Sequence, residues 1–402
     1  MFSFEVLAED GAARLGRLET AHGTVHTPSF VAVATVGSVR SLTLDDLKQI
    51  GTQIMIANTY HLYLRPGTEI IRQAGGLHPF MGWQGPLMTD SGGFQIFSLG
   101  AGKAHGVGKI APIFPQQENK NIPKGPPGTE SPRTKPMVKI TDDGAEFCSY
   151  LDGSRHRFTP EGVIEIQRAL GADLILVLDE CTSPLHDYRY TRGAMNRTHQ
   201  WAQRSLEAFR RKDRGDQALL GVVQGGAYRD LRQESAGFLS ARDFDGFAIG
   251  GSLGNCREDM HRVLEWTIPL LPGQRPRHLL GIGTIEDIFD VVGRGVDLFD
   301  CIAPTRMAGT GTFFSSARDG FRLHILNSRF RTDDRPVQEG CPCYTCRHFS
   351  RAYLRHLFAA NELLGNTLAA IHNLTFVESL MAQIRDAVKD RKLETLRRDW
   401  MG

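Results

Sequence analysis

Short apolar runs recur along the chain, and most of them are followed by a stretch in which apolar residues return at helical spacing. Runs of this length are typical of buried strands. Eight of them cover residues 29–35, 53–59, 85–90, 174–179, 218–224, 246–251, 277–283 and 296–301. Because parallel strands need crossover connections, eight strand–helix units predict an α/β fold, a (β/α)8 TIM barrel.

The segment 159–171 carries the signals of a helix between two strands. Thr159 can cap this helix, Pro160 suits its first turn and Gly171 can end it. Similar apolar spacing predicts helices over residues 257–271 and 284–295.

The strand–helix repeat is interrupted by an insertion at about residues 102–138. Residues 103–136 hold seven of the 19 prolines, and such a composition cannot bury enough apolar surface to order itself. We expect a basic, surface-exposed segment there. Two turn signals, Asp143-Gly144 and Asp152-Gly153, follow it between alternating runs and predict a β-hairpin beside the barrel.

The periodicity changes after Arg306. A strand-rich piece over residues 310–327 precedes a cluster of cysteines, and helical sequence runs from there to Gly402. We therefore expect a barrel with its insertion in residues 1–310, and a C-terminal subdomain, residues 311–402, packed on the barrel.

Composition and charge narrow the class of protein. With 41% hydrophobic and 23% charged residues the chain can bury a core, which excludes global disorder. A formal net charge of +2 excludes binding to nucleic acid through bulk charge, so any RNA contact must come from a local patch. No run reaches the ~20 apolar residues of a membrane span, so we expect a soluble protein with no membrane partner.

The seven cysteines are unevenly distributed. Three crowd into one hexapeptide, and the others stand singly at Cys148, Cys181, Cys256 and Cys301. An odd and mostly unpaired set fits a reducing compartment better than a disulfide framework. We therefore expect a cytoplasmic protein.

The clustered cysteines indicate a metal site. Cys341, Cys343 and Cys346, with His372 further along the chain, offer three thiolates and one imidazole. A closed set of this kind is a structural zinc arrangement, without the open position that a catalytic zinc needs. His348 is the rival for the fourth ligand, although its nearness to Cys346 makes the ring geometry awkward.

Acids, amides and glycines gather where the predicted strands end. They include Asp90, Asp179, Gln224, the pair Gly250-Gly251, and Asp300. Catalytic side chains of TIM barrels stand at these ends, and glycines there let a planar ligand lie against the backbone. Each position taken alone also fits an ordinary turn, because Asp, Asn and Gly are turn residues.

Several motifs carry a more specific signal when they are taken together. They are ANTYHL (57–62), TDSGGFQ (89–95), LDECT (178–182), VVQGG (222–226), GGSLG (250–254), RGVDLFDCIAPTR (294–306) and CPCYTC (341–346) with the distal His372. In this order they resemble tRNA-guanine transglycosylase, the queuine tRNA-ribosyltransferase family, of bacterial type. The resemblance covers the chain except for the proline-rich segment.

The resemblance implies a pentosyltransferase that exchanges guanine at the wobble position of tRNAs with GUN anticodons for a 7-deazaguanine base, in queuosine biosynthesis. It makes Asp300 the nucleophile that forms a covalent ribosyl-aspartate. A carboxylate suits this role because it can trap an oxocarbenium-like carbon. Asp90 matches the family's general acid/base.

The same resemblance implies a pocket for the base. Asp179 would accept hydrogen bonds from the guanine edge, and Gln224 and the N–H of Gly251 would donate to its O6. Phe94 would stack beneath the ring. The other base contacts would come from Ser91, Cys181 and Gly250.

Contacts to tRNA would come from Arg306, close after the nucleophile, and from Arg347 and Arg351 near the cysteine cluster. A long basic side chain on a helix is more often simply solvated, so these three are expected to act as a group. The family also commonly forms homodimers through the zinc-bearing region.

Two features bear on the incoming base in opposite ways. Cys181 is typical of bacterial members, which use preQ1 (7-aminomethyl-7-deazaguanine). The loop after Gly251 is one residue shorter than usual, and Gly254 in the place of a valine would widen the pocket, as in queuine-using enzymes. We expect preQ1, with queuine as the alternative.

Three other functions are weighed against this one. A catalytically silent tRNA-binding paralogue would lack the acids, which are all present. An archaeal relative that modifies the D-loop normally carries an additional C-terminal RNA-binding domain, and this chain stops soon after the helix of His372. A metal-dependent barrel hydrolase needs histidines at strand ends, and only His61, interpreted as a core or supporting residue, is expected near one.

Overall fold

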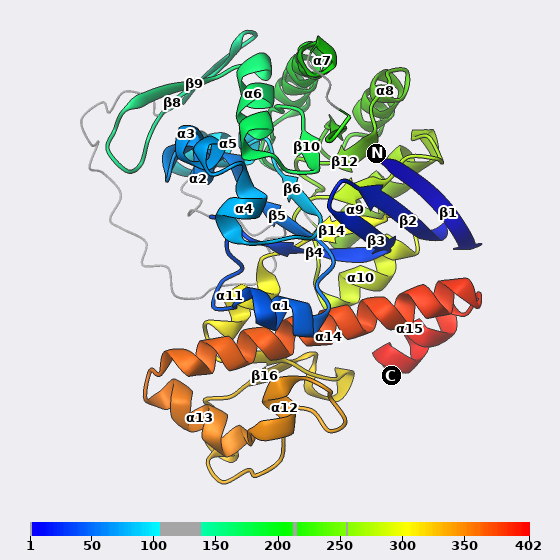
Figure 1. The fold of residues 1–402 in the computed structure, drawn as a ribbon. Coiled ribbons are helices and arrows are strands. Elements are labelled where there is room, and N and C mark those ends of the chain that lie inside the picture. Colours follow the sequence, from blue (N-terminus) through cyan, green and yellow to red (C-terminus); the bar gives the residue numbers. More distant parts are fainter. Residues whose placement is uncertain (1, 105–137, 212–214, 255) are drawn as a thin grey trace, which may run out of the picture.

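The computed structural model describes residues 2–104, 138–211, 215–254 and 256–402. Its centre is a closed barrel of eight parallel strands, and each strand pairs with the next one of the set along the chain (Figure 1). The strands are β4 (Ser29–Val33), β5 (Met55–Ala57), β6 (Leu87–Thr89), β10 (Leu174–Leu176), β11 (Ala218–Val223), β12 (Gly246–Ile249), β13 (Arg277–Leu279) and β14 (Leu298–Asp300). All eight predicted strands, and the predicted TIM barrel, are confirmed.

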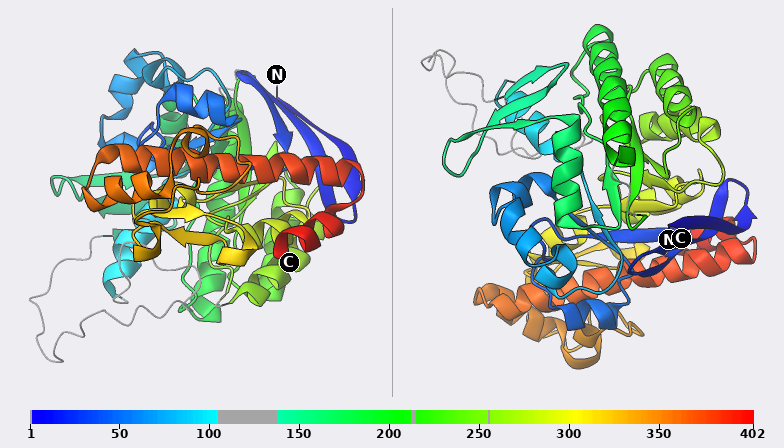
Figure 2. Two further views of the ribbon diagram at one scale, coloured as in Figure 1. Left: turned by 90° about the horizontal axis from the view of Figure 1, so that it is seen from below. Right: turned by 45° about the horizontal axis from the view of Figure 1, so that its top comes forward.

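Helices surround the barrel (Figure 2). They are α1 (Leu44–Ile50), α2 (Thr59–Leu64), α3 (Thr68–Gln73), α4 (Leu77–Met81), α5 (Gly93–Ala104), α6 (Pro160–Leu170), α7 (Tyr188–Arg211), α8 (Arg229–Ser240), α9 (Arg257–Thr267) with the 3-10 turn η1 (Ile268–Leu270), and α10 (Ile285–Val292). The helix predicted over residues 159–171 is α6. The hydroxyl of Thr159 accepts a hydrogen bond from the backbone of Gly162, and Gly171 ends the helix in the left-handed conformation, φ 73°.

Two three-stranded antiparallel sheets accompany the barrel among the described residues. The first, β1 (Ser3–Asp10), β2 (Ala13–Thr20) and β3 (Gly23–Thr27), was not predicted, although β1 alternates in exposure along its length. The second, β7 (Val138–Thr141), β8 (Gly144–Cys148) and β9 (Arg155–Phe158), replaces the predicted hairpin. That prediction was wrong by one strand, because each of the two turn signals joins a separate pair of strands. The predicted insertion lies outside the described residues except at its ends.

The chain after the barrel forms a pair of strands and several helices. These are α11 (Ala303–Ala308), β15 (Thr312–Phe314), η2 (Ala317–Asp319), β16 (Arg322–His324), η3 (Ser328–Phe330), α12 (Tyr344–His348), α13 (Arg351–Ala359), α14 (Leu363–Lys389) and α15 (Leu393–Met401). The antiparallel pair β15 and β16 matches the strand-rich piece expected after Arg306. None of the described helices is long and apolar enough to cross a membrane.

Helix α14 links this region to the barrel. It crosses between the barrel and the elements α12, α13 and β16 (Figure 1), and it contacts α1, β4, β1 and β2. Leu380 and Ile384, in its second half, belong to the same buried core as the barrel strands. Leu368, in its first half, packs in a smaller core with Phe313 of β15 and Leu354 of α13.

Candidate active site

Three buried or half-buried acids stand at one end of the barrel. Asp90 follows β6, Asp179 comes three residues after β10, and Asp300 is the last residue of β14. Because the strands are parallel and closed into a barrel, their carboxyl ends surround one mouth. The three acids predicted from separate strands therefore meet at a common site.

Asp90 is held by the turn that begins α2. Its Oδ1 accepts hydrogen bonds from the backbone of Thr59 at 3.0 Å and of Gly92 at 3.2 Å, and its Oδ2 accepts one from the side chain of Asn58. Burial, and after it the negative charge of Asp300, raise the pKa of Asp90 from 3.8 to about 7, against the opposing effect of these donors. A carboxyl with this pKa can exchange a proton near neutrality.

Asp300 is held through one of its two oxygens. Oδ1 lies 2.9 Å from Nε2 of His278 and 3.3 Å from the backbone nitrogen of Gly281. His278 is the middle residue of β13, one residue before its carboxyl end, so the expectation that His61 alone would lie near a strand end was wrong. The signal was a polar residue inside the apolar run 277–283, because a buried polar side chain needs a partner. The hydrogen bond to Asp300 is that partner.

Asp179 forms the polar floor of the site with two predicted neighbours. Its Oδ1 accepts a hydrogen bond from the hydroxyl of Ser91 at 2.9 Å, and its Oδ2 accepts one from Nε2 of Gln224 at 2.7 Å. Burial raises the pKa of Asp179, and these two hydrogen bonds oppose the rise. The other amide atom of Gln224, Oε1, is buried without a partner among the described residues. It is thus an acceptor available to a ligand that displaces or extends this network.

The glycines of the site make close contacts that side chains would block. Gly251 has φ 72°, and a Cβ on it would stand 2.1 Å from Oε1 of Gln224. A Cβ on Gly250 would stand 2.9 Å from Cγ1 of Val222. Burial raises the pKa of the Cys181 thiol, which also receives a hydrogen bond from the backbone of Gly251. The wall of the pocket that Gly250, Gly251 and Cys181 form is therefore uncharged, because it consists of backbone and a thiol.

Phe94 and His61, both singled out from the sequence, lie at the rim of the site. Phe94, in the first turn of α5, is 47% exposed, so its ring is accessible at the mouth. His61, in α2, contacts the ring of Tyr60 edge-on, and its Nδ1 is 3.4 Å from the hydroxyl of Tyr150. Its backbone N–H donates to Oδ1 of Asn58, the residue whose amide holds Asp90. The backbone of His61 thus helps to hold Asn58, while its side chain contacts the rings of Tyr60 and Tyr150.

The three predicted RNA-binding arginines differ in their surroundings. Arg306, in α11, and Arg347, in α12, are exposed. Arg351 is held within the protein, because its guanidinium donates to Oδ2 of Asp333 at 3.2 Å and to the carbonyl of Val337 at 2.8 Å. A phosphate would have to compete with that pair for Arg351.

The sequence analysis did not single out Arg232, which holds the backbone of two loops at the site. This fully buried residue of α8 donates to four backbone carbonyls, including those of Gly226, Gly250 and Ser252. It thereby ties the loop after β11 to the loop after β12. Burial lowers the pKa of Arg232 to about 9.

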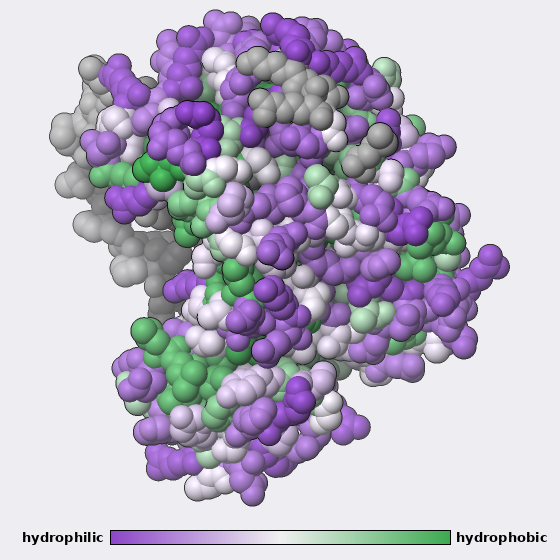
Figure 3. Space-filling model, in the orientation of Figure 1, coloured by the Kyte–Doolittle hydropathy of each residue, from purple (hydrophilic) through white to green (hydrophobic). Residues whose placement is uncertain are grey.

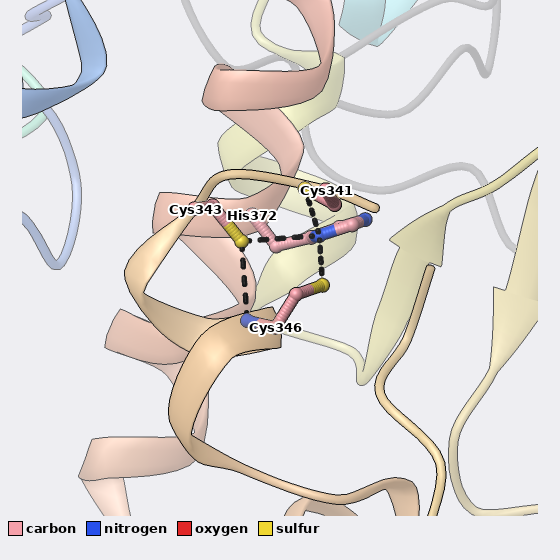
Figure 4. A group of neighbouring side chains, drawn as sticks. All are labelled: Cys341, Cys343, Cys346 and His372. Carbon is pink, nitrogen blue, oxygen red and sulfur yellow. Dashed lines mark hydrogen bonds between the residues drawn. The ribbon is translucent and has the colours of Figure 1, made fainter. Parts of the chain in front are cut away.

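The four predicted metal ligands come together beside the barrel (Figure 4). The sulfurs of Cys341, Cys343 and Cys346 lie 3.8, 3.5 and 3.3 Å from Nδ1 of His372. Ligands at zinc–sulfur and zinc–nitrogen lengths around a tetrahedral ion would be about 3.5 Å apart, so the set fits a closed metal site.

The opposite ring nitrogen of His372 supports this arrangement. Nε2 donates to the carbonyl of Phe314 at 2.9 Å, which leaves the lone pair of Nδ1 for an ion. His348 was the rival ligand. It is exposed, and its Nδ1 lies 2.8 Å from the carbonyl of Tyr344, in its own helix.

Comparisons with known proteins show the family of the chain. The family model for queuine tRNA-ribosyltransferase matches residues 9–111 and 120–402. A protein of Archaeoglobus fulgidus is 49% identical over 396 residues, which are 97% of this chain and 96% of that protein. The queuine tRNA-ribosyltransferase of a Roseiflexus species is 45% identical over 100% of this chain and 99% of its own length. That of Herpetosiphon aurantiacus is 44% identical over 100% of this chain and 92% of its own. The chain therefore belongs to the queuine tRNA-ribosyltransferase family.

Proposed function

We propose that this protein is a tRNA-guanine transglycosylase that works through a covalent bond between Asp300 and the ribose of the wobble nucleotide. One observation carries the proposal: two carboxyls of different character share the barrel mouth. Asp300 is held by its Oδ1, while burial and the charge of Asp300 raise the pKa of Asp90 to about 7. A nucleophile and a proton carrier are the two groups that a double displacement requires.

The reaction runs in two displacement steps at C1′ of the ribose. In the first, Asp300 bonds to C1′ as the C1′–N9 bond breaks, and Asp90 protonates N9 of the departing guanine. In the second, N9 of the incoming base bonds to C1′, its proton passes to Asp90, and the bond to Asp300 breaks. Two inversions at C1′ leave the ribose with its original configuration.

The base would bind against the neutral wall and polar floor described above. Asp179 would accept from N1–H and the 2-amino group, while Gln224 and Gly251 face O6 and Phe94 covers the ring. Since Gln224 donates to Asp179 at 2.7 Å without a ligand, its amide must turn toward the base on binding. We propose preQ1 as the incoming base, with Cys181 and Gly254 near its substituent, and queuine as the alternative.

We propose the remaining features as extensions of this function. The cysteine–histidine set would hold one structural zinc ion, and Arg306 and Arg347 would contact tRNAs with GUN anticodons. Residues 1–310 would act as the catalytic barrel and 311–402 as the zinc subdomain of a cytoplasmic enzyme. A homodimer is supported by the apolar surface where α13 and α14 meet (Figure 3). Leu363, the first residue of α14, is 79% exposed.

The deciding experiment incubates the enzyme with an unmodified tRNA of GUN anticodon and looks for a covalent complex on a denaturing gel. We expect the complex with wild type and none with Asp300→Ala, while both proteins retain the same metal content. A complex that persists in Asp300→Ala would remove Asp300 from the role. Competition of preQ1 and queuine against exchange of labelled guanine tests the choice of base, and a large preference for queuine would overturn it.

A further inference from the structure

The hydrogen bond between His278 and Asp300 divides the two carboxylate oxygens into different roles. The side chain of His278 is fully buried, and its Nε2 lies 2.9 Å from Oδ1 of Asp300. The backbone of Gly281 approaches the same oxygen at 3.3 Å. Within the described part of the chain Oδ2 makes no hydrogen bond, and the side chain of Asp300 is 16% exposed. Oδ2 is therefore the oxygen left for attack.

The surroundings of His278 also indicate which of its ring nitrogens carries a proton. Its Nδ1 is buried without a partner among the residues that the structure describes. An imidazolium has protons on both nitrogens. In this form His278 would bury an Nδ1–H group that has no acceptor, which is costly. An ionised carboxylate only accepts hydrogen bonds, so Nε2 must carry the single proton. His278 is thus a neutral donor beside the nucleophile.

We propose that His278 is a positioning residue that makes Asp300 a good leaving group in the second step of the reaction. This inference rests on the proposed role of Asp300. When Oδ2 bonds to C1′, Oδ1 becomes the carbonyl oxygen of an ester and the negative charge is lost. When the incoming base displaces Asp300, the charge returns and spreads over both oxygens.

The strength of the hydrogen bond differs between these two states. A donor binds an ionised oxygen about twice as strongly as a neutral one. His278 therefore stabilises the free carboxylate relative to the ribosyl ester. Its effect is to keep the covalent intermediate from accumulating and to speed its breakdown.

The test compares His278→Gln with His278→Met, whose side chains have similar length while only glutamine can donate to Oδ1. With tRNA and guanine at equilibrium, the ratio of covalent complex to free enzyme should rise roughly tenfold to a hundredfold in His278→Met. Breakdown of the complex by guanine should slow, while the KM for guanine stays unchanged. His278→Gln should return the ratio toward that of wild type.

Equal ratios in wild type and a folded His278→Met, or equal changes in both variants, would overturn the inference. If His278→Met does not fold, His278→Asn takes its place, because its shorter amide stops short of Oδ1. Asp300→Ala is run in parallel. A wild type that forms no complex, or an Asp300→Ala that still forms one, would refute the proposed function instead.

Discussion

The carboxyls of Asp90 and Asp300 are coupled across the mouth of the barrel. Burial, and then the negative charge of Asp300, raise the pKa of Asp90 to about 7. If Asp300 becomes an ester during the reaction, that charge disappears. The pKa of Asp90 should then fall, so near neutral pH a larger fraction of Asp90 would be protonated, ready to give a proton, before the covalent step, and a larger fraction would be ionised, ready to take one, after it.

This coupling predicts opposite pH dependences for the two half-reactions. Formation of the covalent complex needs protonated Asp90 and should slow as the pH rises through about 7. Breakdown by guanine needs ionised Asp90 and should accelerate with pH, with its midpoint below that of formation. Single-turnover rates from pH 5 to 9 would measure both. Asp90→Asn should slow each step by roughly 10²–10⁴ and flatten both profiles. A shared midpoint would contradict the coupling.

Asp179→Asn should weaken binding of the free base more than binding of tRNA, which is also held by contacts outside the pocket. The substitution removes a charged acceptor and turns an NH2 group toward the 2-amino group of guanine. The KM for guanine should rise by roughly tenfold to a hundredfold, with a smaller rise in the KM for tRNA. Asp143→Asn, at an exposed carboxylate of the β7–β8 turn, is the control. A rise in the KM for tRNA alone would count against a base-binding role.

Cys343→Ser should remove the metal. We expect about one zinc ion per wild-type chain, its loss in the variant, and a Tm lower by at least about 5 °C, because metal binding contributes to folding. Metal analysis and thermal unfolding would measure these changes. Cys148→Ser, at a cysteine outside the cluster, should change neither. A wild-type protein that lacks stoichiometric metal would refute the zinc proposal.

Arg306→Ala and Arg347→Ala should each raise the KM for tRNA and leave the KM for guanine unchanged. Each should also reduce the salt dependence of tRNA binding by about one phosphate contact. Arg398→Ala, at an exposed arginine of α15, serves as the matched control. Arg351→Ala should instead lower the Tm, because Arg351 is paired with Asp333.

Leu363→Glu should convert a homodimer into monomers if the apolar surface at the start of α14 forms the interface. Leu363 is 79% exposed, and a charge there would be costly to bury. Light scattering coupled to size-exclusion chromatography would give the mass. The matched variant Leu326→Glu, at another exposed leucine, should keep the wild-type mass. A wild-type monomer would refute the homodimer itself.

The barrel could be predicted because its strands are buried on both faces and form continuous apolar runs. The N-terminal sheet was missed because β1 is half exposed, and its alternation is a weaker signal than an apolar run. Asp90, Asp179 and Asp300 could be found because each lies at the end of a strand of one closed sheet or within three residues after it. His278 could not be paired with Asp300 in advance, because the contact depends on the register of β13 against β14, which no local pattern records.

Helix α14 belongs both to the metal-binding region and to the core of the barrel. His372 lies near its middle, while Leu380 and Ile384 continue into the core of the barrel. A segment cut out from residue 311 onward would expose the apolar face with which α14 packs on the barrel. The barrel would in turn lose part of its covering. Separating the metal-binding region from the barrel should therefore leave both parts with exposed apolar surface, so that neither is expected to be soluble by itself.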